Sequence, residues 1–309
     1  MSSYFLLFLG MISAGIGGEL FVRGTIGLAG LARISPGIIA ATIAAFATSS
    51  PELSVAINSA LAGKPQISLG DALGSNIVNI ALILGLALTI SQIQSTRDSI
   101  KRDFPIALLI PITTGILFLD GELSRVDGLF MLILFVAWLG AVATEANKQR
   151  SFTEAVIGEH KLWRVAFSCV TGLTFLIAAG NLIVFGAREI AVSFGINEFI
   201  IGATIVAIGT SIPELATTII SKLRGHDEVG LGAILGSNVF NGLFIIAIAA
   251  IIHPIKVPWQ DIAITLAFGI AAIIVVYPSR DGLIQRGRGI LLLATYAAYV
   301  ITISKVSTV

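Results

Sequence analysis

The chain has 309 residues, of which 56% are hydrophobic and only 12% are charged. Soluble globular domains carry about 25% charged residues, so this composition excludes a soluble protein and predicts a polytopic membrane protein. The net charge of +1 provides no basic surface for a nucleic acid. The single cysteine, Cys169, excludes an internal disulfide and a cysteine-based metal site.

Apolar segments recur along the whole chain, and a segment of about 20 apolar residues is long enough to cross a membrane as a helix. Short polar connections separate them, so we predict an all-α membrane protein with ten transmembrane helices. The predicted spans are Tyr4–Ala29, Pro36–Ala62, Leu69–Ser91, Phe104–Leu119, Gly128–Ala146, Trp163–Ala187, Glu198–Ser221, Val229–His253, Ile262–Tyr277 and Gly289–Ile303.

The longest connection, 147–162, is rich in charged residues and divides the chain into two halves, 1–146 and 163–309. Thirteen of the 19 lysines and arginines fall in the odd-numbered connections when Arg164, at the very start of the sixth span, is counted with the linker. Because positive charge is retained on the cytoplasmic side, these connections and the linker are expected to be cytoplasmic. Both termini of this integral cell-membrane protein are then expected to be extracellular.

The two halves repeat one another at a constant offset of 162 residues. Five spans per half is an odd number, so the second half is expected to enter the membrane from the opposite side. Inverted five-helix repeats of this kind are typical of secondary transporters, whose sites lie at the repeat interface. The matching pairs include Gly24/Gly186, Thr42/Thr204, Ala45/Ala207, Thr48/Thr210, Ser49/Ser211, Pro51/Pro213, Glu52/Glu214, Gly70/Gly232, Leu73/Leu235, Gly74/Gly236, Ser75/Ser237, Asn76/Asn238 and Asn79/Asn241.

Spans two and seven each place a glutamate, Glu52 or Glu214, within hydrocarbon, where a charge costs about 3 kcal/mol. The neighbouring prolines, Pro51 and Pro213, have no N–H, so the carbonyls of Ala47 and Gly209 lose their helical partners and become available oxygen ligands. Each glutamate shares a helical face with the threonine four residues earlier, Thr48 or Thr210, and lies near a serine, Ser49 or Ser211. Carboxylate, hydroxyl and carbonyl oxygens suit Ca²⁺, Na⁺ or Mg²⁺.

Spans three and eight supply a complementary set of polar groups. Each has a serine and an asparagine four residues apart, Ser75 with Asn79 and Ser237 with Asn241. Glycines beside them allow the helices to approach closely. Pairing of the two halves brings both glutamates to one central site of charge −2, which one Ca²⁺, several Na⁺ or protons would neutralise.

These two blocks, 40–80 and 202–242, resemble the alpha-1 and alpha-2 repeats of the sodium/calcium exchanger family, within the Ca²⁺/cation antiporter superfamily. The chain is identified as a prokaryotic member by Gly209-Thr210-Ser211-Ile212-Pro213-Glu214-Leu215 and Gly236-Ser237-Asn238-Val239-Phe240-Asn241. The resemblance implies a central Ca²⁺ site held by Glu52, Glu214 and the carbonyls of Thr48 and Thr210. It also implies Na⁺ ligands from Ser49, Ser75, Ser211, Ser237 and the carbonyls of Ala45 and Ala207, with Asn79 and Asn241 lining the centre. Spans one and six, with Glu19 and Arg23 spaced to pair, are implied to form a sliding gate.

Three features depart from the pattern. In the first repeat, Phe46-Ala47-Thr48-Ser49-Ser50 replaces the more usual Gly before Thr. Asn241 stands where some relatives have Asp, which leaves two certain carboxylates at the site. Asp71 breaks the internal symmetry, because its repeat mate is Ala233. Its carboxylate either belongs to an access path or proton pathway, as an accessory to the site, or faces water near the end of its span.

The sequence therefore predicts an antiporter, not an enzyme, that exchanges Ca²⁺ for Na⁺ by alternating access. The alternatives are an H⁺/Ca²⁺ antiporter of the same superfamily and, from another class, a passive cation channel. The transported ions and the lipid bilayer are the expected partners. No cofactor motif or protein partner is indicated.

Overall fold

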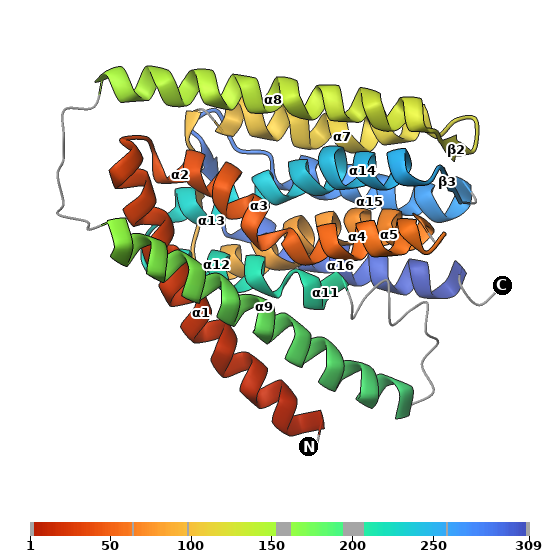
Figure 1. Ribbon diagram of the computed structural model, residues 1–309, viewed down its shortest axis with the longest axis horizontal. Helices are drawn as coiled ribbons and strands as arrows, with labels where there is room; N and C mark the ends of the chain where they lie inside the picture. The colour runs from red at the N-terminus through yellow and green to blue at the C-terminus, as the bar shows by residue number, and fades with distance from the viewer. Residues whose placement is uncertain are drawn as a thin grey trace.

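The computed structural model describes residues 3–63, 65–97, 99–152, 162–193, 207–257 and 259–306, and these are almost entirely helical (Figure 1). In the first half several helices continue into one another through π-helical segments, labelled η. Its elements are α1 Ser3–Ala32, α2 Pro36–Ile39, η1 Ala40–Ala44, α3 Ala45–Thr48, α4 Ser50–Leu61, α5 Pro65–Ile77, η2 Val78–Leu84, α6 Gly85–Ile90, β1 Ile93–Gln94, η3 Ser99–Asp103, α7 Phe104–Leu117, β2 Glu122–Leu123 and α8 Arg125–Phe152.

The second half has a similar order of elements in the part that the structure describes, except that no π-helical segment corresponds to η3. Its elements are α9 Leu162–Ser193, α11 Ala207–Thr210, α12 Ile212–Leu223, α13 Asp227–Val239, η5 Phe240–Ile245, α14 Ile246–Ile252, β3 Ile255–Lys256, α15 Trp259–Val276, β4 Leu283–Ile284 and α16 Gly287–Val306.

The element bounds repeat between the halves at the offset of the sequence repeat. The pairs α4 and α12, α5 and α13, and β1 and β3 each begin and end 162 residues apart. The π-helical segments η2 and η5 also begin 162 residues apart. Such segments are rare and often lie at functional sites, so their recurrence indicates a functional position at the same point of both halves.

Two short antiparallel strand pairs join the halves. Strand β1 pairs with β4, and β2 pairs with β3, where Lys256 also forms an ion pair with Glu122 at 3.0 Å. Because β1 and β2 flank α7, the two pairs lie at opposite ends of that helix. The β2–β3 pair lies at the same end of the bundle as the C terminus (Figure 1). Strands β1 and β4 lie in odd-numbered connections between the predicted spans, and β2 and β3 lie in even-numbered ones. Odd-numbered connections thus pair with each other, and so do even-numbered connections.

Four stretches among the described residues are long and apolar enough to cross a membrane as single helices: Pro65–Ile90, Arg125–Lys148, Leu162–Ala179 and Asp227–Ile252. A bent pair, Phe8–Ala32 with Pro36–Thr48, turns by 116° and forms a fifth candidate. Two apolar helices, Ile262–Val276 and Gly287–Ile303, are shorter. The ten predicted spans are thus not all unbroken helices, and the start of the seventh lies outside the described residues.

Helix ends differ from the predicted span ends because a helix does not stop where the apolar residues stop. Helix α8 runs on to Phe152, so the first residues of the predicted linker are helical. Helix α5 begins at Pro65 and not at Leu69, since proline fits the first turn of a helix. The rest of the predicted linker, 153–161, lies outside the described residues.

The core is apolar and aromatic, and the outer face is also apolar. Phe135 on α8 packs against Phe240 of η5, with ring centroids 5.0 Å apart. The same helix exposes Ile133 and Val136, which suits contact with lipid chains. Helix α8 runs along one side of the bundle, and α1 and α9 cross the opposite side obliquely (Figure 1).

Helices α1 and α9 pack closely on each other because small residues line their contact. A methyl group at Gly24 would collide with the half-buried Cys169, and one at Gly172 would collide with the backbone of Phe21. On the other face of α1, Glu19 accepts hydrogen bonds from Arg23, as its spacing predicts, and from Arg224 of the second half.

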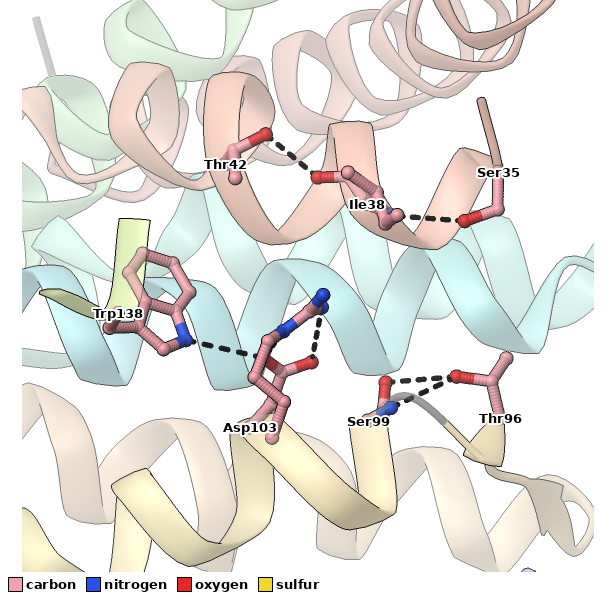
Figure 2. A network of polar contacts seen from close by, with 8 residues as sticks. Ser35, Ile38, Thr42, Thr96, Ser99, Asp103 and Trp138 are labelled. Atoms are coloured by element: carbon pink, nitrogen blue, oxygen red, sulfur yellow. Dashed lines mark hydrogen bonds and ion pairs between the residues drawn. The ribbon is translucent and has the colours of Figure 1, made fainter. Parts of the chain in front are cut away.

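A network of polar contacts fixes the starts of α2 and α7 (Figure 2). The buried Asp103 carboxylate accepts hydrogen bonds from Arg102 at 2.8 and 3.1 Å and from the Trp138 indole at 3.3 Å. Ser35 caps α2 by accepting from the Ile38 amide. A second buried cation, Lys222, pairs with Asp227 at 2.9 Å and donates to the Gln92 carbonyl, which ties β1 to α12 and α13.

Candidate functional site

The candidate site is built around two matching helix breaks. Helix α3 ends before Ser49 and α4 starts after it, and Ser211 separates α11 from α12 in the same way. The backbone angles of the two serines agree: φ −83° and ψ 9° for Ser49, φ −84° and ψ 7° for Ser211. Pro51 and Pro213 lie in the first turns of the new helices, so both breaks follow from the missing proline N–H.

The carbonyl freed by Pro51 is not available as expected. The Ser50 hydroxyl donates to the Ala47 oxygen at 2.8 Å and replaces the lost amide. The prediction of an unpartnered ligand oxygen at Ala47 is therefore wrong. The second half has Ile212 in place of Ser50, so the carbonyl of Gly209 has no corresponding hydroxyl.

The two alanine carbonyls predicted as Na⁺ ligands are buried at the breaks. The Ala45 oxygen accepts from the Ser49 amide at 2.9 Å and from the Thr48 hydroxyl at 3.2 Å. The Ala207 oxygen accepts from the Ser211 amide and the Thr210 hydroxyl, both at 3.2 Å. A carbonyl has two lone pairs, so each oxygen would bind a cation only after its threonine hydroxyl turned away.

The two glutamates are each 1% exposed and face groups from the opposite half. The Thr210 hydroxyl interacts with Glu52, and the Thr48 hydroxyl with Glu214. Glu214 also accepts from Ser49 at 3.4 Å and from Ser237 of its own half at 2.9 Å. The break of each half thus lies against the carboxylate of the other, as the symmetry of the repeat requires.

Helices α5 and α13 meet at the centre of the molecule. The Asn76 amide donates to the Asn238 carbonyl and the Asn238 amide to the Asn76 carbonyl, both at 3.2 Å. The Asn79 amide donates to the Asn238 side-chain oxygen at 3.0 Å. This crossing was not predicted from sequence, although equivalent asparagines beside glycines in both halves were its signal.

Ser75 and Asp71 approach the break of the second half. The Ser75 hydroxyl lies 3.4 Å from that of Thr210, whose single proton can be donated to the Asp71 carboxylate at 3.4 Å in place of the Ala207 carbonyl. Asp71 is 8% exposed, so the alternative in which it faces water is wrong. Its role at the site is a separate question.

Several buried polar atoms at the helix breaks and on the spans of the asparagine crossing have no partner among the described residues. An unpartnered buried polar atom costs about 1–3 kcal/mol, and more if it is charged. The breaks and the crossing therefore offer oxygens that a cation would satisfy. No group of three or more His, Cys, Asp or Glu residues in the described ranges has the arrangement of a metal site. The unpartnered donors at the breaks and the crossing are carboxylates, a hydroxyl and amides. At the breaks these atoms are Glu52 Oε2, Glu214 Oε2 and Ser211 Oγ, and on the spans of the crossing they are Asn76 Oδ1, Asn79 Oδ1, and Asn241 Oδ1 and Nδ2.

Comparisons with known proteins agree with this geometry. A family model described as sodium/calcium exchanger protein matches residues 2–143 and 165–305. The putative antiporter CaxA of Alkalimonas amylolytica is 37% identical over 243 residues, which cover 76% of each chain. The sodium/calcium exchanger MaX1 of Methanosarcina acetivorans is 26% identical, with 97% of this chain and 98% of its own covered.

A solved structure has the same fold. The sodium-calcium exchanger NCX_Mj, soaked with Na⁺ and Sr²⁺, matches with a TM-score of 0.84 and 28% identity over 97% of each chain. The expected family is thus confirmed by both its sequence model and its structure. The chain belongs to the sodium/calcium exchanger protein family.

Proposed function

We propose that this chain is a secondary antiporter that exchanges Ca²⁺ for Na⁺ across the cell membrane by alternating access. The observation that carries this function is the pairing of each buried glutamate, Glu52 and Glu214, with the helix break of the other half. Neither half alone holds this arrangement, which suits a substrate site at a repeat interface. Family membership supports the same function.

The ion ligands proposed for this site follow from its donors. Two carboxylates give a charge of −2, which one Ca²⁺ or two Na⁺ neutralise, and both cations prefer oxygen ligands. Ca²⁺ takes Glu52, Glu214 and the carbonyls of Thr48 and Thr210. Na⁺ takes the hydroxyls and carbonyls around them, with asparagine side chains lining the centre: Ser49, Ser75, Ser211, Ser237, the Ala45 and Ala207 carbonyls, Asn79 and Asn241.

Shared ligands couple the two ions. Because Ca²⁺ and Na⁺ use the same two carboxylates, the loaded forms exclude each other. Two unpaired carboxylates within the membrane are costly, so the empty site does not change its access. Only an occupied site switches sides, and this produces exchange without leak.

The proposed architecture is ten transmembrane helices in two inverted five-helix repeats, 1–146 and 163–309, joined by the cytoplasmic linker 147–162. The matching element bounds support the duplication. The strand pairs support the inversion. If each half takes the place of the other, the β1–β4 pair falls on the β3–β2 pair, which lies at the opposite end of the bundle. The distribution of lysine and arginine supports extracellular termini.

The function is tested by Ca²⁺ flux in proteoliposomes in which the Na⁺, K⁺ and H⁺ gradients are varied separately. We expect radioactive Ca²⁺ to enter Na⁺-loaded vesicles, and entry to stop when Na⁺ is equal on both sides. Uptake that ignores Na⁺ but follows a pH gradient would reassign the chain as an H⁺/Ca²⁺ antiporter. Uptake without any counter-ion would indicate a cation channel.

A further inference from the structure

A line of polar side chains follows α5 into η2 toward the proposed site. Asp71, Ser75 and Asn79 are spaced by four residues and therefore share one helical face. At 1.5 Å per residue, Asp71 lies about 6 Å from Ser75, toward the start of α5. Helix α5 packs against β3, whereas the same span continues through η2 and α6 to β1 at the other end, so Asp71 lies between the site and the β2–β3 end of the bundle.

Thr210 connects Asp71 to the proposed ion ligands. Its hydroxyl lies 3.4 Å from both the Asp71 carboxylate and the Ser75 hydroxyl, and it also interacts with Glu52. Asp71 and Thr210 are 8% and 9% exposed, whereas Ser75 and Glu52 are 0% and 1% exposed. Asp71 and Thr210, which we call the corner, thus form the less buried edge of this four-residue cluster and contact its fully buried centre.

The charge at this corner is not balanced by the protein. Carboxylates other than Asp71 accept the ion pairs of Arg23, Arg102, Lys222, Arg224, His226 and Lys256. A buried carboxylate without a cation is costly. The symmetry mate, Ala233, is fully buried beside Ala40 and Val229, so the other half has no matching charge.

We propose that Asp71 is an outer cation-binding residue that receives Ca²⁺ or Na⁺ from the β2–β3 side and delivers it past Thr210 to Glu52. It serves only this side of the exchanger, because Ala233 occupies the related position on the path from the other side. A single fixed charge on an approach path concentrates cations there and speeds their arrival. This inference rests on the proposed function and adds a difference between the two sides.

The test compares Ca²⁺ flux in right-side-out and inside-out membrane vesicles that carry the Asp71→Asn variant. With β2–β3 extracellular, we expect the half-maximal Ca²⁺ concentration to rise about tenfold on the extracellular side and to change less than about twofold on the cytoplasmic side. Asp71→Glu should restore the extracellular value. Ser68→Ala, which removes a buried hydroxyl from the same helix, is the matched control and should leave both values unchanged.

Equal changes on both sides, or no change on either, would overturn the role of Asp71. So would loss of equilibrium Ca²⁺ binding by the purified variant, because that would place Asp71 in the central site. A wild-type measurement avoids any folding defect: choline chloride should weaken Ca²⁺ affinity more on the extracellular side, and an equal effect on both sides would contradict the proposal. Failure of the proposed function shows separately, as Ca²⁺ flux that does not respond to Na⁺.

Discussion

Asn76 and Asn238 bind each other reciprocally, each side-chain amide donating to the backbone carbonyl of the other at 3.2 Å. These residues are repeat mates, so their contact marks the pseudo-two-fold axis between the halves. The symmetry ends one turn away. Asn79 Nδ2 donates to Asn238 Oδ1. The equivalent donor and acceptor of the other half, Asn241 Nδ2 and Asn76 Oδ1, have no partner among the described residues.

The first prediction concerns this crossing. Asn238→Ala removes two side-chain hydrogen bonds, to Asn76 and Asn79, whereas Asn76→Ala removes one. Each lost bond leaves a buried group unpaired, at a cost of about 1–3 kcal/mol. We expect the thermal unfolding temperature in detergent to be highest for wild type, lower for Asn76→Ala and lowest for Asn238→Ala. The exposed Gln66→Ala on α5 is the control and should match wild type, and a reversed order would show that the crossing does not hold the halves together.

A second prediction separates stability from ion binding. Asp103→Asn removes the carboxylate that partners Arg102 and Trp138 outside the site. Breaking a buried ion pair from one side costs about 3–5 kcal/mol, so the unfolding temperature should fall. The Na⁺ and Ca²⁺ concentrations for half-maximal flux should stay unchanged. Asp120→Asn in an exposed turn is the control, and altered ion affinity in Asp103→Asn would mean that this network reaches the site.

The sequence was sufficient to locate the breaks and their carboxylates, because proline and an intramembrane glutamate have direct physical consequences. It did not reveal that Ser50 would satisfy the Ala47 carbonyl, since that depends on a side-chain rotamer. Nor did it decide whether Asp71 belongs to an access or proton path or faces water, because its contact with Thr210 depends on how α11 packs. The π-helical segments have no composition that distinguishes them from an α-helix.

A third prediction uses the two serine contacts to Glu214. Ser237 donates at 2.9 Å and Ser49 at 3.4 Å, so Ser237 orients the carboxylate more strongly. Hydrogen bonds to charged groups contribute about 1.5–3 kcal/mol. In flux assays, Ser237→Ala should therefore raise the Na⁺ concentration for half-maximal exchange by about tenfold or more, and Ser49→Ala by less. An equal or reversed effect would contradict the observed geometry.

A fourth prediction concerns pH. Protons and Ca²⁺ compete for Glu52 and Glu214, and a protonated carboxyl has no charge to attract a cation. Lowering the pH from about 8 to about 6 should therefore raise the Ca²⁺ concentration needed for half-maximal binding, and raising the pH should reverse the change. Equilibrium binding of radioactive Ca²⁺ across this range measures the effect. Tighter binding at the lower pH would show that cation binding does not need ionised carboxylates.

The central claim is that both halves contribute one carboxylate each to a single Ca²⁺ site. Equilibrium Ca²⁺ binding to the purified protein, compared with Glu52→Gln and Glu214→Gln, tests it most directly. Glu145→Gln, in the C-terminal part of α8 and outside the site, is the control and should bind like wild type. We expect wild type to bind one Ca²⁺ per chain that Na⁺ displaces, and either glutamine variant to bind none. Two Ca²⁺ per wild-type chain, with one retained in each variant, would mean that each half holds its own site.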